Sequence, residues 1–153
     1  MTPNTPSRFS DVLARLAQDR VRCVIVGGVA TVLLGHSRPI EDLDLVVAAD
    51  PVSTAQAMQS PSAAGFVPSL PLPLALVTVL RLYDANGREV DVFARYPVPF
   101  DELLRTSIEA DVDGVSLRIA SRAHLIHAKR AFARPHDLAD VAALEALPQV
   151  PSS

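Results

Sequence analysis

The spacing of apolar residues along the chain predicts helices and strands in alternation. Between residues 10 and 20 the apolar positions recur at intervals of three and four, which is typical of an amphipathic helix. Short β-branched runs at 21–26 and 41–47 instead predict buried strands. The same criteria predict further helices over 29–34, 52–63, 100–108, 121–133 and 136–147, with Ser121 as the N-cap of the fifth.

The middle of the chain predicts a β-hairpin. Residues 74–83 and 88–94 flank Asp84-Ala85-Asn86-Gly87, and an Asn-Gly pair between such runs favours a tight turn. Before it, residues 60–73 hold four prolines and a glycine, which predicts an irregular loop or edge crossing. With another strand at 115–119, the pattern predicts an α/β or α+β fold, in which helices flank a small mixed β-sheet and a C-terminal helix pair ends the chain.

Three acidic residues lie within the predicted strands. Asp42 and Asp44 are two residues apart, so in a strand they point to the same face, and Asp91 can join them if its strand pairs alongside. Converging carboxylates repel one another unless a cation neutralises them, and Mg²⁺ prefers oxygen ligands. A surface acid cluster at a strand edge is the alternative, but the apolar residues around these acids disfavour an ordinary edge.

These acids belong to an ordered set of motifs. The set consists of Val26-Gly27-Gly28, a gap over residues 29–41, Asp42-Leu43-Asp44 and Val90-Asp91-Val92. It resembles the signature of the nucleotidyltransferase superfamily, which includes DNA polymerase β and the minimal nucleotidyltransferases. The sequence around the glycines, with Arg38 shortly before the acids, is similar to the branch that contains AbiEii-type toxins and similar small bacterial proteins. The resemblance covers about residues 21–144 and implies a nucleotidyltransferase fold.

The resemblance implies a role for each of these residues. Asp42 and Asp44 would bind the metal ions that hold the reactive phosphate and the leaving pyrophosphate, while Asp91 would hold the second of two Mg²⁺ ions and help to activate the attacking hydroxyl. Gly27 and Gly28 would let backbone N–H groups approach the triphosphate, although a strand-to-helix turn alone also explains them.

Two basic residues are further candidates for nucleotide binding. Arg38 could contact a phosphate or brace a carboxylate, or it could be an ordinary surface residue. Relatives in this branch often carry threonine at the position of Ile40. Helical spacing places Lys129 in the middle of an apolar face, where a charge needs a partner. Lys129 also begins a stretch that resembles the Lys…Arg-x-x-Asp-x-x-Asp motif of AbiEii-like proteins, and either a nucleotide contact or an ion pair of Asp137 with Lys129 or Arg134 would explain it.

The function that follows is a Mg²⁺-dependent nucleotidyltransferase. It would transfer a nucleoside monophosphate from an NTP to a hydroxyl on a tRNA, a protein or a small molecule, with a toxin–antitoxin setting among the contexts that the resemblance implies. Acceptor recognition would involve a partner protein, a homodimer or the proline-rich segment at 60–73. The alternatives are a catalytically inactive binding or regulatory module of antitoxin type, and a phosphohydrolase in which water replaces the acceptor.

Composition limits the other classes of function. A chain of 153 residues with 49% hydrophobic residues predicts one globular domain, 1–153, with a core over about 8–147 and a tail at 148–153. No apolar run is long enough to span a bilayer and no signal peptide is evident, so a cytoplasmic protein without membrane contact is expected. The single cysteine, Cys23, excludes an intrachain disulfide.

The charge of the chain is unevenly distributed. A net charge of −3 argues against a protein that coats nucleic acid. Residues 118–136 nevertheless contain five basic residues and no acid, which predicts either a solvated helix face or a wall that faces phosphates. His124 and His127 fall on the predicted exposed face of the fifth helix, where neither cysteine nor acid would complete a zinc site.

Overall fold

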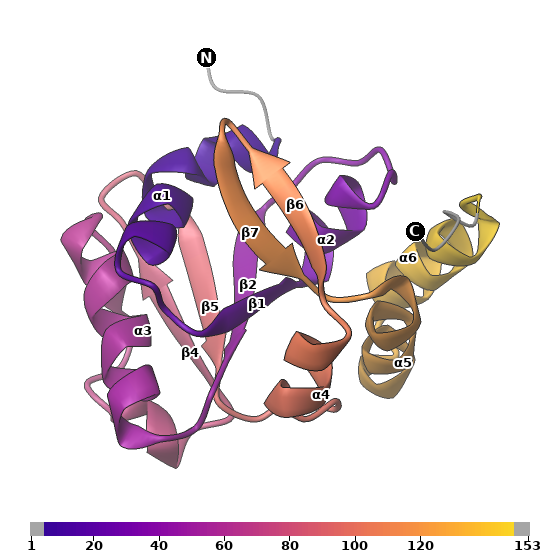
Figure 1. Ribbon diagram of the computed structural model, residues 1–153. Coiled ribbons are helices and arrows are strands. Elements are labelled where there is room, and N and C mark those ends of the chain that lie inside the picture. The colour runs from indigo at the N-terminus through magenta and orange to yellow at the C-terminus, as the bar shows by residue number, and fades with distance from the viewer. Residues whose placement is uncertain (1–4, 149–153) are drawn as a thin grey trace.

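The computed structural model describes residues 5–148, and in this range seven strands form one mixed sheet (Figure 1). The strands are β1 (Cys23–Val26), β2 (Asp42–Val47), β3 (Val67–Pro68), β4 (Val79–Tyr83), β5 (Glu89–Phe93), β6 (Ile108–Val112) and β7 (Val115–Ile119). Their order across the sheet is β3-β4-β5-β2-β1-β7-β6. The pairs β2–β5 and β1–β7 are parallel, and the other neighbours are antiparallel. The sheet is thus mixed, as the sequence predicted.

Helices flank the sheet. Over the same range they are α1 (Ser10–Gln18), α2 (Gly27–Leu33), α3 (Pro51–Ala63), α4 (Phe100–Arg105), α5 (Arg122–Phe132) and α6 (Pro135–Ala146), with short 3-10 helices η1 (Pro6–Phe9) and η2 (Leu74–Leu76). Helix α1 packs against α3, while α5 and α6 pack together to one side of the sheet (Figure 1). The C-terminal helix pair is therefore confirmed, and Ser121 caps α5 by accepting a hydrogen bond from the backbone N–H of His124 at 3.3 Å.

The central strands separate an apolar face from a polar one. In β2, Leu43 and Leu45 are fully buried, and in the neighbouring β5 the same holds for Val90 and Val92. These side chains belong to one hydrophobic cluster with residues of α1 and α3. Because side chains alternate along a strand, the residues between them point to the opposite face. The packing of the core therefore fixes which residues face the other way.

The two strands at the edges of the sheet are the main departure from the predicted elements. Strand β6 was not predicted, and α4 ends at Arg105 because Ile108 already begins that strand. Most of β6 is exposed, so it lacks the apolar run that predicts a buried strand. The proline-rich segment is only partly irregular. Its first residues complete α3, Pro61 included, and the two-residue strand β3 pairs with β4.

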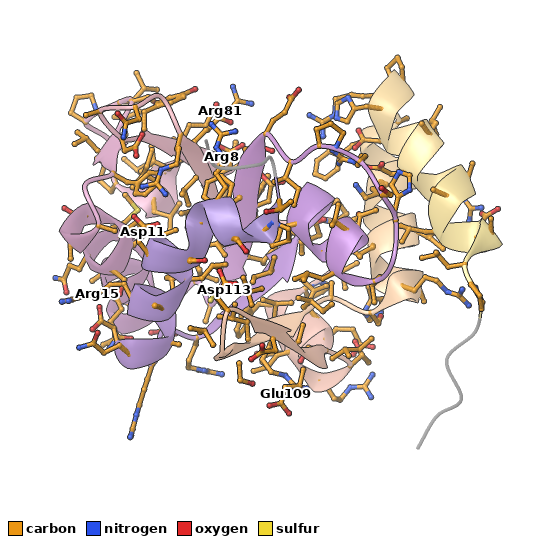
Figure 2. The ribbon with its side chains drawn as sticks, turned by 90° about the horizontal axis from the view of Figure 1, so that it is seen from above. Arg8, Asp11, Arg15, Arg81, Glu109 and Asp113 are labelled. Carbon is orange, nitrogen blue, oxygen red and sulfur yellow. The ribbon has the colours of Figure 1, made fainter. Side chains whose placement is uncertain are left out.

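Two polar contacts join the N-terminal helices to the hairpins. Arg88 donates hydrogen bonds to both carboxylate oxygens of Asp11 on α1, each at 2.8 Å, and to Asp84 at 2.7 Å. Asp113, in the turn between β6 and β7, accepts hydrogen bonds from the hydroxyls of Ser7 and Ser10. Figure 2 shows Asp11 on α1 and Asp113 close to that helix. Both contacts hold α1 over the sheet.

Some predictions concern single residues or the chain ends. Cys23 is half-buried at the start of β1, and burial raises the pKa of its thiol to about 12, so it behaves as a small apolar residue. Across residues 5–148, no helix combines the length and the apolar character needed to cross a bilayer. The predicted tail at 148–153 lies, except for its first residue, outside the described residues.

Candidate active site

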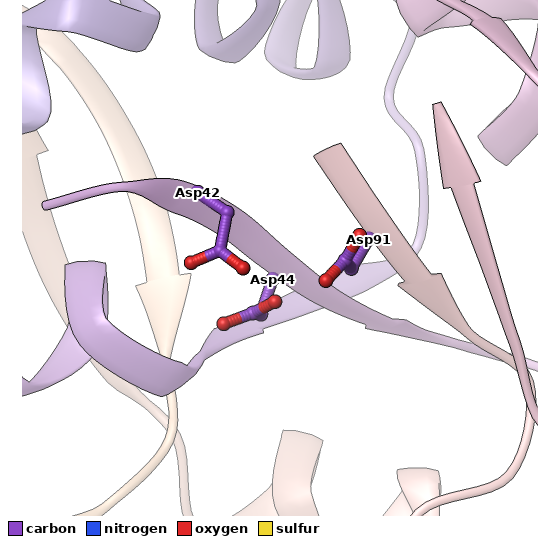
Figure 3. A group of neighbouring side chains, drawn as sticks. All are labelled: Asp42, Asp44 and Asp91. Atoms are coloured by element: carbon purple, nitrogen blue, oxygen red, sulfur yellow. The ribbon is translucent and has the colours of Figure 1, made fainter. Parts of the chain in front are cut away.

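Asp42, Asp44 and Asp91 converge on the polar face of the sheet (Figure 3). Each offers a carboxylate oxygen, and these oxygens all lie within 4.8 Å of one another. Strands β2 and β5 run in parallel with Asp44 directly beside Asp91, which explains how acids 47 positions apart along the chain meet. The three carboxylates that the motifs singled out are thus brought together.

Neighbouring side chains leave no space for a Cβ atom at Gly27 or Gly28. Gly27 has a φ of +66°, and a Cβ atom there would lie 2.0 Å from Oδ2 of Asp44. A Cβ atom on Gly28 would lie 2.7 Å from Nη2 of Arg38. Any larger residue at either position would therefore displace an acid or a base of the site.

Burial and mutual repulsion make the three acids hard to ionise together. Burial raises the pKa of Asp44 to about 7, and the charge of Asp42 adds to this shift. Burial also raises the pKa of Asp91 to about 9, with a further contribution from Asp44. Oδ1 of Asp91 is buried and accepts no hydrogen bond from the described residues. A buried oxygen that accepts no hydrogen bond, within a group of oxygen donors, fits a divalent cation such as Mg²⁺, because the ion would neutralise the acids and coordinate that oxygen.

Lys129 and Arg38, which line the same cleft as the acids, meet at a buried carboxylate. The ammonium of Lys129, on α5, lies 2.8 Å from Oδ2 of Asp140 on α6, and Nη2 of Arg38 lies 2.9 Å from the same oxygen. Lys129 is only 4% exposed and Asp140 only 2%. The buried position predicted for Lys129 is confirmed. Its acidic partner is Asp140, whereas Asp137 pairs with Arg134 at 2.6 Å.

The basic stretch at 118–136 divides between two surroundings. Lys129, Arg134 and His136 line the same cleft as the acids. Arg122 instead donates to the carbonyl oxygen of Leu147, and the remaining basic residues contact other surface groups, namely Arg118 with Ser107 and Arg130 with Glu145. Part of the stretch therefore lies in the cleft and part at the surface, and a wall that faces phosphates stays a prediction.

His124 does not lie on an exposed face as predicted, and the structure also places His36 and Ile40. His124 is half-buried, and its Nδ1 lies 2.9 Å from the hydroxyl of Thr106, so it does not belong to an exposed face. His36 approaches Asp140, with Nε2 3.7 Å from Oδ1. Ile40 is fully buried in the core, so its side chain takes no part in the polar surface of the site.

The cleft also contains residues that the motifs did not indicate. It encloses about 590 Å³ between the polar face of the sheet and the α5–α6 junction. Glu89 and Arg81 line it, and Nε of Arg81 lies 3.8 Å from Oδ1 of Asp91. Strand alternation could have indicated Glu89, because it lies two residues before Asp91. The register of the hairpin could have indicated Arg81, because it is the cross-strand neighbour of Asp91. The cleft wall also includes three aromatic residues, Phe93, Tyr96 and Phe132, for which the sequence gives no comparable signal.

Solved structures share this arrangement of helices and strands. The lincosamide antibiotic adenylyltransferase LnuA aligns with 96% of this chain and 100% of its own at 13% identity, with a TM-score of 0.68. The antibiotic-resistance factor ANT(2'')-Ia aligns over 89% of this chain and 80% of its own, at 14% identity and a TM-score of 0.64. An antigenic nucleotidyltransferase-like protein from Paracoccidioides brasiliensis gives 22% identity over 98% of this chain and 82% of its own, with a TM-score of 0.58.

Sequence comparison adds nothing to these structural matches, since no family model and no curated protein matches the chain. The structural matches extend over most of each partner, so they concern the whole arrangement and not an isolated motif. They agree with the order of glycines and acids in the sequence, which predicted the same fold. The protein has the nucleotidyltransferase fold.

Proposed function

We propose that the protein is a Mg²⁺-dependent nucleotidyltransferase. The observation that carries this proposal is the convergence of Asp42, Asp44 and Asp91, whose carboxylate oxygens lie within 4.8 Å of one another in a cleft. Two Mg²⁺ ions held by these acids would polarise the reacting phosphate and offset the charge of the leaving pyrophosphate. The nucleotidyltransferase fold agrees with this chemistry but does not by itself establish it.

The chain's own residues would position the NTP for transfer. Arg38 and Lys129 supply positive charge to the cleft beside the acids, where a triphosphate would need it. Because Gly27 and Gly28 carry no side chain, Asp44 and Arg38 fit against them, and the backbone N–H groups of the glycines would approach the phosphates. The acceptor oxygen would bond to the α-phosphorus as the bond to the bridging oxygen breaks, and pyrophosphate would leave with that electron pair. Asp91 would receive the hydroxyl proton.

A small molecule with a hydroxyl group is the acceptor we favour. LnuA was solved with lincomycin bound, and ANT(2'')-Ia in complex with adenylyl-2''-tobramycin, so two neighbours in fold are associated with small antibiotics. A protein or tRNA acceptor, a homodimer or partner protein, and a toxin–antitoxin setting within the cytoplasm remain predictions of the sequence resemblance.

The first test is calorimetric titration of ATP, GTP, CTP and UTP in Mg²⁺. The wild type should bind at least one NTP, and the Asp42→Asn, Asp44→Asn double variant should lose the Mg²⁺-dependent part of the binding. Release of pyrophosphate in the presence of an acceptor would identify transfer, whereas release of inorganic phosphate would identify hydrolysis. Binding without turnover under any acceptor would favour the inactive module.

A further inference from the structure

Three aromatic rings form a compact cluster in the wall of the cleft. The ring centroids of Phe93 and Tyr96 are 5.4 Å apart, those of Tyr96 and Phe132 are 5.8 Å apart, and Phe93 and Phe132 are separated by 6.4 Å. We call these three residues the aromatic cluster. They come from β5, from the segment after it, and from the last residue of α5, so only the fold brings them together.

The aromatic cluster presents exposed ring surface to the cleft. All three rings line the cleft, and Phe132 is 37% exposed although it is a large apolar residue. The guanidinium of Arg134 lies over the Phe132 ring, with Cζ 5.3 Å from the ring centroid. A planar group thus already occupies the face of this ring in the protein alone. Stacking on an aromatic face is the interaction by which proteins hold flat π-systems without reading their edges.

The aromatic cluster lies close to Asp91 along β5 and close to Lys129 along α5. Phe93 follows Asp91 by two residues on β5, so both point to the same face about 7 Å apart along the strand. Phe132 follows Lys129 by three residues on α5, so it lies on the same side of the helix and roughly 4.5 Å further along its axis. Any ligand that placed phosphates between Lys129 and the acids would therefore bring its next chemical group to these rings.

We propose that the aromatic cluster holds the base of the nucleotide, with Phe132 as its stacking platform. The inference rests on the proposed function, because it takes the α-phosphate to lie at the acids. Only the ribose separates the base from that phosphate, which suits the offset between Asp91 and the rings. Arg81, which lies beside Asp91 on β4 and also lines the cleft, is left for the acceptor.

Stacking predicts weak discrimination among the four bases. Every base has a π-face, so all four NTPs should bind, and the purines should bind more tightly because two fused rings cover more of Phe132.

The test compares ATP with tripolyphosphate, which carries the same phosphates and no base. Both are titrated in Mg²⁺ into the wild type and into Phe132→Ala, Phe132→Leu and Phe132→Tyr variants of the full chain. Loss of the ring should weaken ATP binding roughly 5- to 100-fold in the alanine and leucine variants, whereas tripolyphosphate should bind as before. The tyrosine variant should retain ATP binding. Leu138→Ala is the matched control, because Leu138 is 49% exposed on α6 and is not among the residues that line the cleft.

The remaining outcomes separate this inference from the proposed function. Equal weakening of both ligands, or of neither, would overturn the base site while leaving the nucleotidyltransferase in place. Unchanged ATP binding together with slower transfer to an acceptor would assign the rings to the acceptor and would also overturn it. If the wild type bound neither ATP nor tripolyphosphate, the proposed function would fail and the inference with it.

Discussion

At the scale of single residues, Gly27 connects backbone conformation to the placement of a carboxylate. Its φ of +66° lies in the left-handed region, and Asp44 occupies the space that a side chain would need. The glycine is therefore required before any phosphate arrives. The position of Asp44 therefore explains the glycine at residue 27 as well as the approach of a ligand does.

Replacement of Gly27 by alanine should separate these two effects. In Gly27→Ala the new Cβ would force Asp44 aside, so we expect at least a tenfold loss of Mg²⁺-dependent NTP affinity, along with about 1–2 kcal/mol of backbone strain. Gly114→Ala is the control, because Gly114 has a similar φ of +84° and open space around its Cβ position. Calorimetry and urea unfolding measure both quantities. Equal NTP affinity in the two variants would contradict the role given to Gly27.

The residues of the site differ in how far the sequence predicted them. Alternation along a strand makes Asp42 and Asp44 neighbours, and the motif order adds Asp91, so the convergence of the acids was predicted, while their catalytic role stays a prediction. Asp140 is the last acid of the stretch that resembles the Lys…Arg-x-x-Asp-x-x-Asp motif, but its contacts with Lys129 and Arg38 depend on how α5 and α6 cross. The pairing of Tyr96 with Phe132 depends on tertiary packing alone. No local pattern encodes that contact.

At the scale of secondary-structure elements, Arg88 ties α1 to the β4–β5 hairpin. Besides its hydrogen bonds to Asp11 and Asp84, it donates to the carbonyl oxygen of Arg8 at 2.8 Å and lies over the ring of Phe66. The side chain is 17% exposed, so these charge-assisted contacts are partly shielded from water. Strand β5 carries Asp91, and Arg88 directly precedes this strand. The contact therefore supports the element that presents one of the acids.

Arg88→Met should destabilise the protein by about 1–3 kcal/mol at neutral pH, because charge-assisted hydrogen bonds are lost. The hydrogen bond from Arg88 lowers the pKa of Asp11. Burial acts to raise the pKa of Asp84, but hydrogen bonds from the side chain and backbone of Arg88 outweigh it and lower the pKa. Carboxyl groups with lowered pKa values stabilise the fold above their unfolded pKa of about 4 and lose this effect as the pH falls further.

The difference between wild type and Arg88→Met should therefore shrink as the pH falls below about 4. Urea unfolding at pH 7 and at pH 3 measures this difference. Arg15→Met is a suitable control, since Arg15 on α1 is 44% exposed and, within residues 5–148, forms its ion pair with Asp19 at the C-cap of the same helix. A difference that stayed constant across this pH range would show that Arg88 acts through packing on Phe66 and not through the carboxylates.

The elements themselves were mostly predictable, and the exceptions have a common cause. Helices with a clear apolar stripe and buried β-branched strands appear close to their predicted positions. Strands β3 and β6 form at the edges of the sheet, where one side of the strand has no neighbour and the residues are mostly exposed. Their formation depends on pairing with a neighbouring strand, and the local sequence does not indicate that pairing.

At the scale of the whole molecule, Asp140 joins the C-terminal helix pair to the sheet. Its carboxylate bonds to Lys129 on α5 and to Arg38, which precedes β2 and covers Gly28. Burial works to raise the pKa of Asp140, but the hydrogen bonds from Lys129 and Arg38 prevail and lower it. Asp140 therefore stays ionised between two cations and sets how the α5–α6 pair lies against the acids.

Asp140→Asn should cost about 3–5 kcal/mol of unfolding free energy, because it removes the ion-pair partner of a buried lysine. Lys129→Met should cost less, since Arg38 continues to neutralise Asp140 and methionine fills the same space. The comparison is made by urea unfolding at pH 7. An Asp140→Asn variant as stable as the wild type would show that the helix pair is held by apolar packing alone.

Because side chains alternate along β5, the register of this strand determines both the packing of the core and the position of Asp91 in the site. Val90 and Val92 point into the core while Asp91 points into the cleft, and Asp44 lies directly beside Asp91. A shift by one residue would bury the acid and turn both valines towards the ligand. Insertions or deletions in the Asp84–Gly87 turn would therefore harm folding and chemistry together, whereas changes of length in the exposed turn at Gly114 would leave the catalytic frame intact.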